Sequence, residues 1–345
     1  MYGILTAAIV AALLVGALTP AVKRWAEQIG AVDQPSARRI NTAPMPRLGG
    51  VAILVGFLVA VILTVTVRQI SSGQHNWTHE VVGLLVAVIF AALLGLTDDL
   101  KDLSAKWQAI GLVAIGVILF LFGVRIEGIS NPFAGPLPAH YNPDVYWHAL
   151  APPISLICTV VWVFVVTKTV DAIDGVDGLA AGVCAIAAAT LALMSAQLHT
   201  ADGPTLQRYD GPTLALIAAA LMGACIGFLR FNYHPARIIM GTSGAWVLGT
   251  ALAAISILGA FKMATILSVF VPVLVLGVPL FDYVHVLTRR VIAHAPLTKA
   301  DKRHLHHRLL ERGWSQRQVT MFIYSLAIAL CLAAFALFQA RHHIR

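Results

Sequence analysis

The chain has 345 residues, of which 59% are hydrophobic and only 12% are charged, and its formal net charge is +8 at pH 7. Soluble proteins carry roughly twice this charged fraction, so the composition excludes an ordinary soluble protein, and it equally excludes a disordered or disulfide-stapled chain. The sequence therefore predicts an all-α, polytopic transmembrane protein.

Ten apolar runs are long enough to be membrane-spanning helices, because a bilayer core of about 30 Å needs roughly 20 residues of helix. Helices are favoured because lipid offers no partner to exposed backbone groups. The predicted spans are residues 2–22, 49–67, 81–96, 107–124, 153–166, 179–198, 213–229, 244–260, 263–287 and 321–340. Residues 1–345 are expected to form a single integral-membrane domain, with a long His/Arg-rich loop at 288–320.

The basic residues are distributed unevenly over the two sets of loops. Eighteen of the 24 Lys and Arg lie near 23–48, 97–106, 167–178, 230–243 and 288–320, and eleven of the 16 acidic residues lie on or near the same face. Because cytoplasmic loops are rich in Lys and Arg, this face is predicted to be cytoplasmic, with both termini outside. The mixture of acids and bases indicates a metal ion and a polyanionic substrate, and argues against nucleic acid.

Adjacent carboxylates, Asp98 and Asp99, stand at the cytoplasmic end of the third span, and Asp102 follows. Neighbouring carboxylates repel each other, and a divalent cation relieves that repulsion. Magnesium typically takes one or two protein carboxylates and completes its octahedron with water and phosphate. If the helix continues, Asp98 and Asp102 share a face; a simple helix-end charge cluster is the alternative.

Three aspartates at intervals of three, Asp171, Asp174 and Asp177, lie between the fifth and sixth spans, with glycines at 175 and 178. Glycine lets the backbone approach a ligand such as a diphosphate or a metal closely. Asp177 is also placed to cap the sixth span, but capping explains neither Asp171 nor Asp174. The pattern favours a functional segment.

A third group of residues precedes the eighth span. Asn232 and Arg237 are followed by Thr242 and Ser243, which stand between glycines at the start of the predicted helix. The N–H groups at a helix N-terminus bind anions, and Arg237 can add a bidentate phosphate contact. Taken alone, either hydroxyl residue can simply be a cap.

The longest cytoplasmic loop carries His304, His306, His307 and Arg308. Adjacent histidines without Cys or an HExxH motif match zinc sites poorly, so phosphate or nucleotide binding is the better interpretation, with contact to anionic lipid as the alternative. Asp282 lies in an apolar stretch of the ninth span. Carboxylates in such positions indicate function, although a structural partner such as a nearby Arg is equally compatible.

In this order the motifs resemble those of the polyprenyl-phosphate N-acetylhexosamine-1-phosphate transferases, the integral-membrane glycosyltransferase family 4. The resemblance covers nearly the whole chain. It rests on residues 33–39 and 44–50, Asp98-Asp99, residues 174–179, Asn232, residues 240–241, Phe281-Asp282 and residues 304–313. The histidine loop and the Phe-Asp pair are more similar to the UDP-N-acetylglucosamine branch than to the muramoyl-pentapeptide branch.

The resemblance implies an enzyme of the bacterial inner membrane whose active site faces the cytoplasm. A polyprenyl phosphate, usually undecaprenyl phosphate, attacks the β-phosphorus of a UDP-sugar, with UDP-N-acetylglucosamine as the expected donor. UMP leaves, and the lipid-linked sugar starts cell-wall or other polysaccharide synthesis. The implied cofactor is Mg²⁺, with Mn²⁺ as an alternative. The sequence leaves the oligomeric state open, a homodimer being one option.

The resemblance also implies roles for individual residues. The implied catalytic residues are Asp98, Asp99, Asp174 and Asp177. Three of them, Asp98, Asp99 and Asp174, are also expected metal ligands, together with Asp171 and Thr242. The expected substrate contacts are Arg38, Arg39, Lys106, Asn232, Arg237, His304, His306, His307 and Arg308. A base is not required, since a phosphate monoester is already largely ionised at neutral pH.

The chain departs from the family pattern at three places. Thr242 stands where the family has a metal-binding Asp, residues 168–171 read Lys-Thr-Val-Asp in place of Asn-Ala-x-Asn, and Asn41 replaces a common His. The hypothesis is relocation. Asp171 returns a carboxylate to the metal, Lys168 adds a cation for the diphosphate, and Thr242 offers a neutral oxygen, as the hydroxyl of a P-loop does.

Two other classes remain open from the sequence. An inactive paralogue that binds a nucleotide sugar or a lipid phosphate without turnover would account for Thr242. A secondary transporter is expected to show paired repeat halves and charges near the midplane, whereas the charges here gather at one interface.

Overall fold

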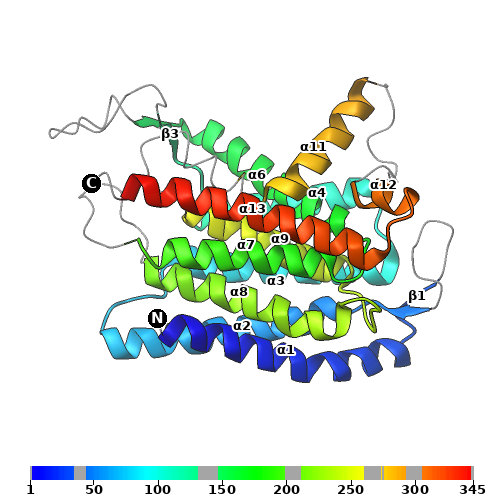
Figure 1. Cartoon of the computed structure of the whole chain (residues 1–345). Helices are drawn as coiled ribbons and strands as arrows, with labels where there is room; N and C mark the ends of the chain where they lie inside the picture. Colours follow the sequence, from blue (N-terminus) through cyan, green and yellow to red (C-terminus); the bar gives the residue numbers. More distant parts are fainter. Residues whose placement is uncertain are drawn as a thin grey trace.

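The computed structural model describes residues 2–34, 44–130, 147–198, 211–259, 273, 276–292 and 305–342, and it is a helical bundle (Figure 1). The first half contains α1 (Tyr2–Gln28), α2 (Gly49–Ser72), α3 (His79–Lys101), α4 (Ala105–Leu121) and α6 (Pro152–Ile173). The second half contains α7 (Leu179–Ser195), α8 (Gly211–Asn232), α9 (Gly241–Leu258), α11 (Gly277–Ile292), α12 (Leu305–Glu311) and α13 (Gln316–His342).

Two short antiparallel hairpins complete the described residues. β1 (Val32–Asp33) pairs with β2 (Met45–Pro46), with Val32 opposite Pro46. β3 (Gly128–Ser130) pairs with β4 (Trp147–Ala149), with Ile129 opposite His148. The two hairpins lie at opposite ends of the bundle (Figure 1).

Seven of the described helices are long and apolar enough to cross a membrane: α1, α2, α3, α6, α8, α9 and α13. Two shorter apolar helices, α4 and α7, coincide with the predicted fourth and sixth spans. The all-α, polytopic class predicted from the composition is therefore confirmed. The predicted ninth span, 263–287, lies largely outside the described residues, which contain only its last part in α11.

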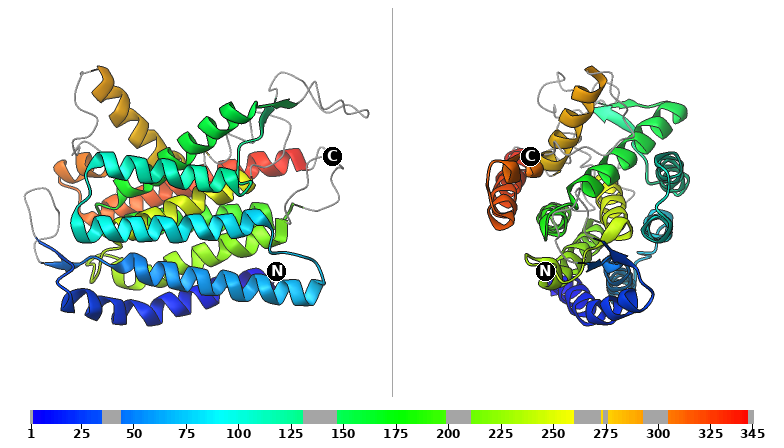
Figure 2. Two further views of the ribbon diagram at one scale, coloured as in Figure 1. Left: turned by 180° about the vertical axis from the view of Figure 1, so that it is seen from behind. Right: turned by 90° about the vertical axis from the view of Figure 1, so that its right-hand side faces the viewer.

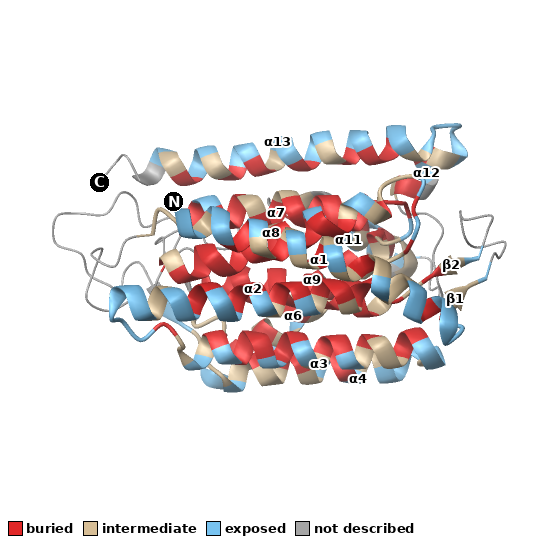
Figure 3. Cartoon of the chain, turned by 90° about the horizontal axis from the view of Figure 1, so that it is seen from below, coloured by how far each residue is buried: buried red, intermediate tan, exposed pale blue. Residues whose placement is uncertain are grey.

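The core of the bundle is formed by α7, α8 and α9, whose residues are buried on most sides (Figure 3). α9 packs against α2, α3 and α6, and α8 packs against α1, α2 and α7. Outer helices instead expose large apolar side chains, such as Leu13 on α1 and Leu332 on α13. Such outward apolar faces suit contact with lipid tails, which are as apolar as leucine.

Glycines let α2 and α3 approach the start of α9 very closely. A Cβ atom at Gly95 would lie 2.5 Å from the Cα atom of Ser243, and one at Gly50 would collide with the backbone of Gly244. Small residues at helix interfaces are the usual means of close backbone approach in membrane bundles. The first turn of α9 is consequently held beside the end of α3, where Asp98 and Asp99 lie.

The two chain termini lie at one end of the bundle, and β1, β2 and α12 lie at the other (Figures 1 and 2). We call the end with β1, β2 and α12 the polar end, because the described parts of the segments predicted to be cytoplasmic, such as the ends of α3 and α6 and the start of α9, meet there. The end with the termini is called the far end. α11 leans away from the bundle, next to α6 and α13 (Figure 2).

Helices at the polar end extend beyond the predicted spans. α3 continues to Lys101 and α6 continues to Ile173, and α12 and the start of α13 occupy part of the segment 288–320 that was predicted to be a loop. Hydropathy detects only the part of a helix that lies in lipid, whereas backbone bonding continues into polar sequence. Lys168 and Asp171 are therefore on a helix.

Candidate active site

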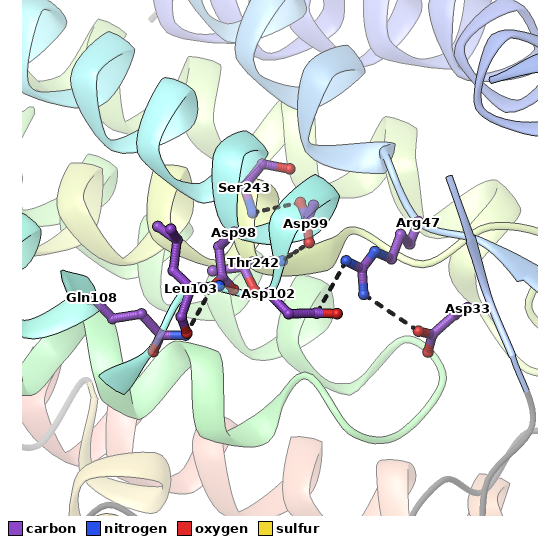
Figure 4. A network of polar contacts seen from close by, with 9 residues as sticks. All are labelled: Asp33, Arg47, Asp98, Asp99, Asp102, Leu103, Gln108, Thr242 and Ser243. Atoms are coloured by element: carbon purple, nitrogen blue, oxygen red, sulfur yellow. Dashed lines mark hydrogen bonds and ion pairs between the residues drawn. The ribbon is translucent and has the colours of Figure 1, made fainter. Parts of the chain in front are cut away.

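The carboxylate of Asp99 occupies the N-terminus of α9. It accepts the N–H groups of Thr242 at 2.9 Å and Ser243 at 3.0 Å (Figure 4). Gly241 has φ +72°, and a Cβ atom there would lie 2.7 Å from both carboxylate oxygens of Asp99. Only glycine therefore fits at this position. The anion predicted at this helix start is thus a carboxylate of the chain itself, stabilised by the N–H groups and the helix dipole.

Neither Thr242 nor Ser243 caps α9 with its side chain. The N-cap residue is Met240, which makes no side-chain cap bond. The capping explanation for the two hydroxyl residues is therefore wrong, and their backbone N–H groups instead join α9 to α3.

Asp98 points to a different set of donors. One of its oxygens accepts the backbone N–H of Leu103 at 3.0 Å and the side-chain amide of Gln108 at 2.8 Å (Figure 4). Helix α3 ends at Lys101, and Asp102 follows in a left-handed conformation with its side chain 89% exposed. The helix does not continue, so Asp98 and Asp102 do not share a face.

Arg47 connects the first hairpin to the end of α3. Its guanidinium lies 3.5 Å from a carboxylate oxygen of Asp33 and 3.3 Å from one of Asp102 (Figure 4). Arg47 was not among the predicted site residues. The only signal for it in the sequence is its place in the 44–50 motif.

Lys168 and Asp171 form an ion pair one turn apart on α6, with 2.8 Å between Nζ and Oδ2. The same ammonium donates to the side-chain oxygen of Gln108 at 2.8 Å and lies 5.4 Å from the ring centre of Trp246 on α9. A lysine over an indole ring gains a cation–π attraction. Gln108 and Trp246 were both missed in the sequence, where nothing about their residue type marks them.

Asp174 follows the end of α6 and is partly buried. Burial, and then the negative charges of Asp171, Asp99 and Asp177, raise the pKa of its carboxyl well above the usual range. This mutual effect shows that carboxylates from α3 and from the segment after α6 are close to one another. Asp98, Asp99, Asp171, Asp174 and Asp177 are called the acid cluster below.

Asp177 does not cap α7, because the N-cap residue is Gly178 and it makes no side-chain cap bond. Instead, one oxygen of Asp177 lies 2.8 Å from Nδ1 of His234 and accepts the N–H of Ala236 at 3.1 Å. His234 precedes a proline in the α8–α9 segment and was missed in the sequence. These contacts join the third aspartate to the α8–α9 segment.

Asn232 is a clamp between these two segments. Its side-chain oxygen accepts the N–H of Gly178 at 3.1 Å, and its amide donates to the carbonyl of Ile238 at 3.0 Å. The hydroxyl of Tyr324, on α13, donates to the carbonyl of Gly178 at 2.6 Å. Asn232, predicted to contact substrate, therefore links the turn at Gly178 to the α8–α9 segment.

The histidine segment lies against the acid cluster through His306. This residue is buried, and a Cβ atom at Gly175 would lie 3.2 Å from its Nε2 atom. Asp282, on α11, accepts the N–H of Leu305 at 2.7 Å, which ties α11 to the first residue of α12. The buried carboxylate of Asp282 thus has a backbone partner.

The remaining predicted site residues are exposed or lie outside the described residues. Lys106, Arg237 and Arg308 are exposed. Arg38, Arg39, Asn41 and His304 lie outside the described residues, as does the side chain of His307.

A metal ion can be tested against the donors that are present. Among the described residues, no three His, Cys, Asp or Glu side chains are arranged to hold a metal. Asp98, Asp99 and Asp177 each accept two N–H donors, and Asp171 is paired with Lys168. Within the same residues, Asp174 is the one carboxylate of the acid cluster that accepts no hydrogen bond. Asp174 is therefore the carboxylate that would hold a magnesium ion, with a substrate phosphate and water supplying the other ligands.

Fold and site together define a multi-pass membrane protein with an acid-rich polar end, and comparisons with known proteins give its family. The family described as glycosyl transferase family 4 matches residues 81–260. The chain is 34% identical over 341 residues to a probable undecaprenyl-phosphate N-acetylglucosaminyl 1-phosphate transferase of Bacillus subtilis, covering 99% of this chain and 86% of that protein.

Two further relatives agree with this match. A decaprenyl-phosphate N-acetylglucosaminephosphotransferase of Mycobacterium tuberculosis is 32% identical, over 91% of this chain and 77% of that protein. A phospho-N-acetylmuramoyl-pentapeptide-transferase of Beutenbergia cavernae is 28% identical, over 92% and 91%. The chain therefore belongs to glycosyl transferase family 4 and is a transferase, which confirms the family predicted from its motifs.

Proposed function

We propose that the protein transfers N-acetylglucosamine 1-phosphate from UDP-N-acetylglucosamine to a polyprenyl phosphate, such as undecaprenyl phosphate, and releases UMP. The observation that carries this proposal is the meeting of three separate acid- and hydroxyl-bearing segments at one end of the bundle. Asp98 and Asp99, Asp171 to Asp177, and the start of α9 are joined there by direct hydrogen bonds or charge effects. The relatives named for N-acetylglucosamine phosphate transfer support the choice of sugar.

In the proposed reaction, a phosphate oxygen of the lipid forms a bond to the β-phosphorus of the donor. The bond between that phosphorus and the bridging oxygen breaks, and UMP leaves with the electron pair. No protein base is required, because the lipid phosphate is already largely ionised near neutral pH. Catalysis then consists mainly of positioning and of stabilising negative charge.

The residues of the polar end supply these tasks. Lys168 provides an ammonium beside the acid cluster, and His306 lies against the glycine turn that follows Asp174. Asp174 would hold a magnesium ion, which neutralises diphosphate charge when bound. Arg237 and Arg308, which are exposed, can attract the two anionic substrates. Clamping by Asn232 keeps the Asp177–Gly178 turn in place.

A substrate with a long apolar tail and a phosphate head group suits a bundle that has apolar outer faces and one polar end. Outer helices expose apolar side chains, so the polyprenyl chain can remain in lipid while its phosphate reaches the polar end. The proposal places this end at the cytoplasmic face of a bacterial inner membrane, with both termini outside, as the distribution of Lys and Arg predicts. The product would begin the synthesis of a cell-envelope polysaccharide.

The test is a donor panel with purified protein in detergent. UDP-N-acetylglucosamine, UDP-N-acetylgalactosamine and UDP-glucose are each incubated with undecaprenyl phosphate and Mg²⁺, and released UMP is quantified. We expect UMP release with UDP-N-acetylglucosamine that depends on the lipid acceptor. Binding of the nucleotide sugar without UMP release from any donor would contradict the proposal, and would instead support the inactive paralogue that Thr242 suggested.

A further inference from the structure

The ammonium of Lys168 is held by partners from three helices. It contacts Asp171 on α6 and Gln108 on α4, each at 2.8 Å, and it lies over the ring of Trp246 on α9. The amide of Gln108 donates in turn to Asp98 on α3. A continuous series of polar contacts, called the Lys168 network below, therefore runs from Asp98 through Gln108 and Lys168 to Asp171. It connects the carboxylates of α3 with those of α6 and the segment after it.

The Lys168 network determines which carboxylates of the acid cluster are available to bind a cation. The side chains of Lys168 and Asp171 are only 20% and 25% exposed, so their attraction is weakly screened. The ammonium, bound to one carboxylate oxygen of Asp171, therefore competes with an incoming cation for this carboxylate. Removing one member of such a pair leaves the other charge uncompensated, which is costly. The lysine is thus a built-in counter-ion at a place where a divalent cation would otherwise bind.

A diphosphate changes this balance. An ammonium group has three donors and no fixed fork geometry, so it can transfer from one anion to another by rotation of its long side chain. If the ammonium moves to a diphosphate, the negative charge of Asp171 is left uncompensated beside Asp174. A divalent cation would then be bound by the freed carboxylate and by the added phosphate charge together.

We propose that Lys168 makes divalent-cation binding conditional on the diphosphate: it holds Asp171 in the substrate-free protein and releases it when a nucleoside diphosphate enters. The inference rests on the proposed function for the presence of a diphosphate site. It makes Asp171 a ligand of the cation and Lys168 the positioning residue that controls access to this ligand.

The experiment measures binding of Mn²⁺ to the full-length protein in detergent, with and without UDP. Water-proton relaxation is suitable, because Mn²⁺ on the slowly tumbling protein is distinguished from free Mn²⁺ and from Mn²⁺–UDP in buffer. We expect the protein to bind Mn²⁺ at least about tenfold more tightly when UDP is present, since a neighbouring unit charge typically changes such equilibria by one or more factors of ten.

Variants test whether Lys168 is responsible. Lys168→Met should bind Mn²⁺ alone about tenfold more tightly than the wild type, and UDP should then raise its Mn²⁺ affinity by a smaller factor than in the wild type, because only the phosphate contribution remains. Lys168→Arg keeps the charge and should retain the wild-type dependence on UDP. The double variant Lys168→Met/Asp171→Asn should lose the gain in Mn²⁺ affinity. Lys101→Met, at an exposed lysine of the same end, is the matched control and should resemble the wild type.

Two results would overturn the inference. One is tight Mn²⁺ binding by the wild type that UDP does not change, and the other is a folded Lys168→Met protein with unaltered Mn²⁺ affinity. Folding of each variant is checked by its elution volume and melting temperature. Because no turnover is measured, the coupling between UDP and Mn²⁺ can be present in a protein that fails the sugar-transfer assay, so the two proposals fail separately.

Discussion

The two ends of the bundle use charge in different ways. At the far end, Arg125 pairs with Glu127, two residues away, and both side chains are more than a third exposed. At the polar end, Asp98, Asp99 and Asp177 are buried. Asp99 and Asp177 accept bonds from segments 143 and 59 residues away, and Asp98 accepts one from the start of the next helix, α4. Burying a carboxylate costs free energy unless donors compensate it. The concentration of such carboxylates at one end therefore indicates a function rather than solubility.

The largest difference between the ends is expected from a change in the acid cluster. Asp174→Asn removes the carboxylate that has no hydrogen-bond partner among the described residues, and should lower kcat by about 10²- to 10³-fold, as loss of a charge-stabilising group does. UMP release is the measurement. The control is Glu127→Gln at the far end, which should keep nearly full activity; comparable losses in the two variants would contradict the division between the ends.

Two glycines with positive φ offer a second comparison. Gly241, at the polar end, has φ +72°, and a Cβ atom there would meet Asp99 and the carbonyl of Arg47. Gly73, at the end of α2, has φ +67° and open space around it. Gly241→Ala should destabilise the protein by about 2 kcal/mol and reduce activity, whereas Gly73→Ala should cost about 1 kcal/mol. Thermal unfolding in detergent and UMP release are measured together, and equal effects at the two glycines would be inconsistent with the packing around Asp99.

A histidine at each end gives a smaller contrast. His234→Leu removes the ring that holds Asp177, and should raise KM for the UDP-sugar about fivefold, which corresponds to the loss of one hydrogen bond of about 1 kcal/mol. His234→Asn can restore an N–H donor and should recover part of the loss. His148→Leu, at an exposed residue of β4, should leave KM unchanged. A fall in kcat with unchanged KM at His234 would argue against a part in donor binding.

The smallest effect is expected for the ion pair at the far end. Arg125→Gln removes an ion pair whose two side chains are more than a third exposed, so the free energy of unfolding should change by no more than about 0.5 kcal/mol. Melting temperatures with and without added salt measure it. A large salt-sensitive loss of stability would show that charge at this end is more important than its exposure indicates.

Much of the fold was predictable because hydropathy reports directly on burial in lipid. Nine of the predicted spans fall within or close to the described helices, and the remaining one, 263–287, lies largely outside the described residues. The candidate residues were predictable by type, since Asp98, Asp99, Asp174 and Asp177 are acidic residues in close, regular spacing. Their partners were not predictable. Asp99 bonds to Thr242, 143 residues away, and the contact depends on a close approach of two helices that local sequence does not encode.

The helix ends and the uncharged members of the network were missed for a similar reason. Hydropathy gives no signal where a helix leaves the lipid and continues, as α6 does through Lys168 and Asp171. Gln108 and Trp246 are ordinary residues of apolar helices until the packing of α4, α6 and α9 brings them to the same ammonium. Spacing along the chain identifies the acids, and only tertiary packing identifies the groups that control them.

The central claim, transfer of a sugar phosphate by the acid-rich end of a membrane bundle, is tested most directly by following the β-phosphorus of the donor. UDP-N-acetylglucosamine labelled with ³²P at that atom is incubated with the protein, undecaprenyl phosphate and Mg²⁺. We expect the label to move into the lipid fraction while unlabelled UMP is released in equal amount. Label that remains in the nucleotide, as UDP or as unreacted donor, would contradict the central claim.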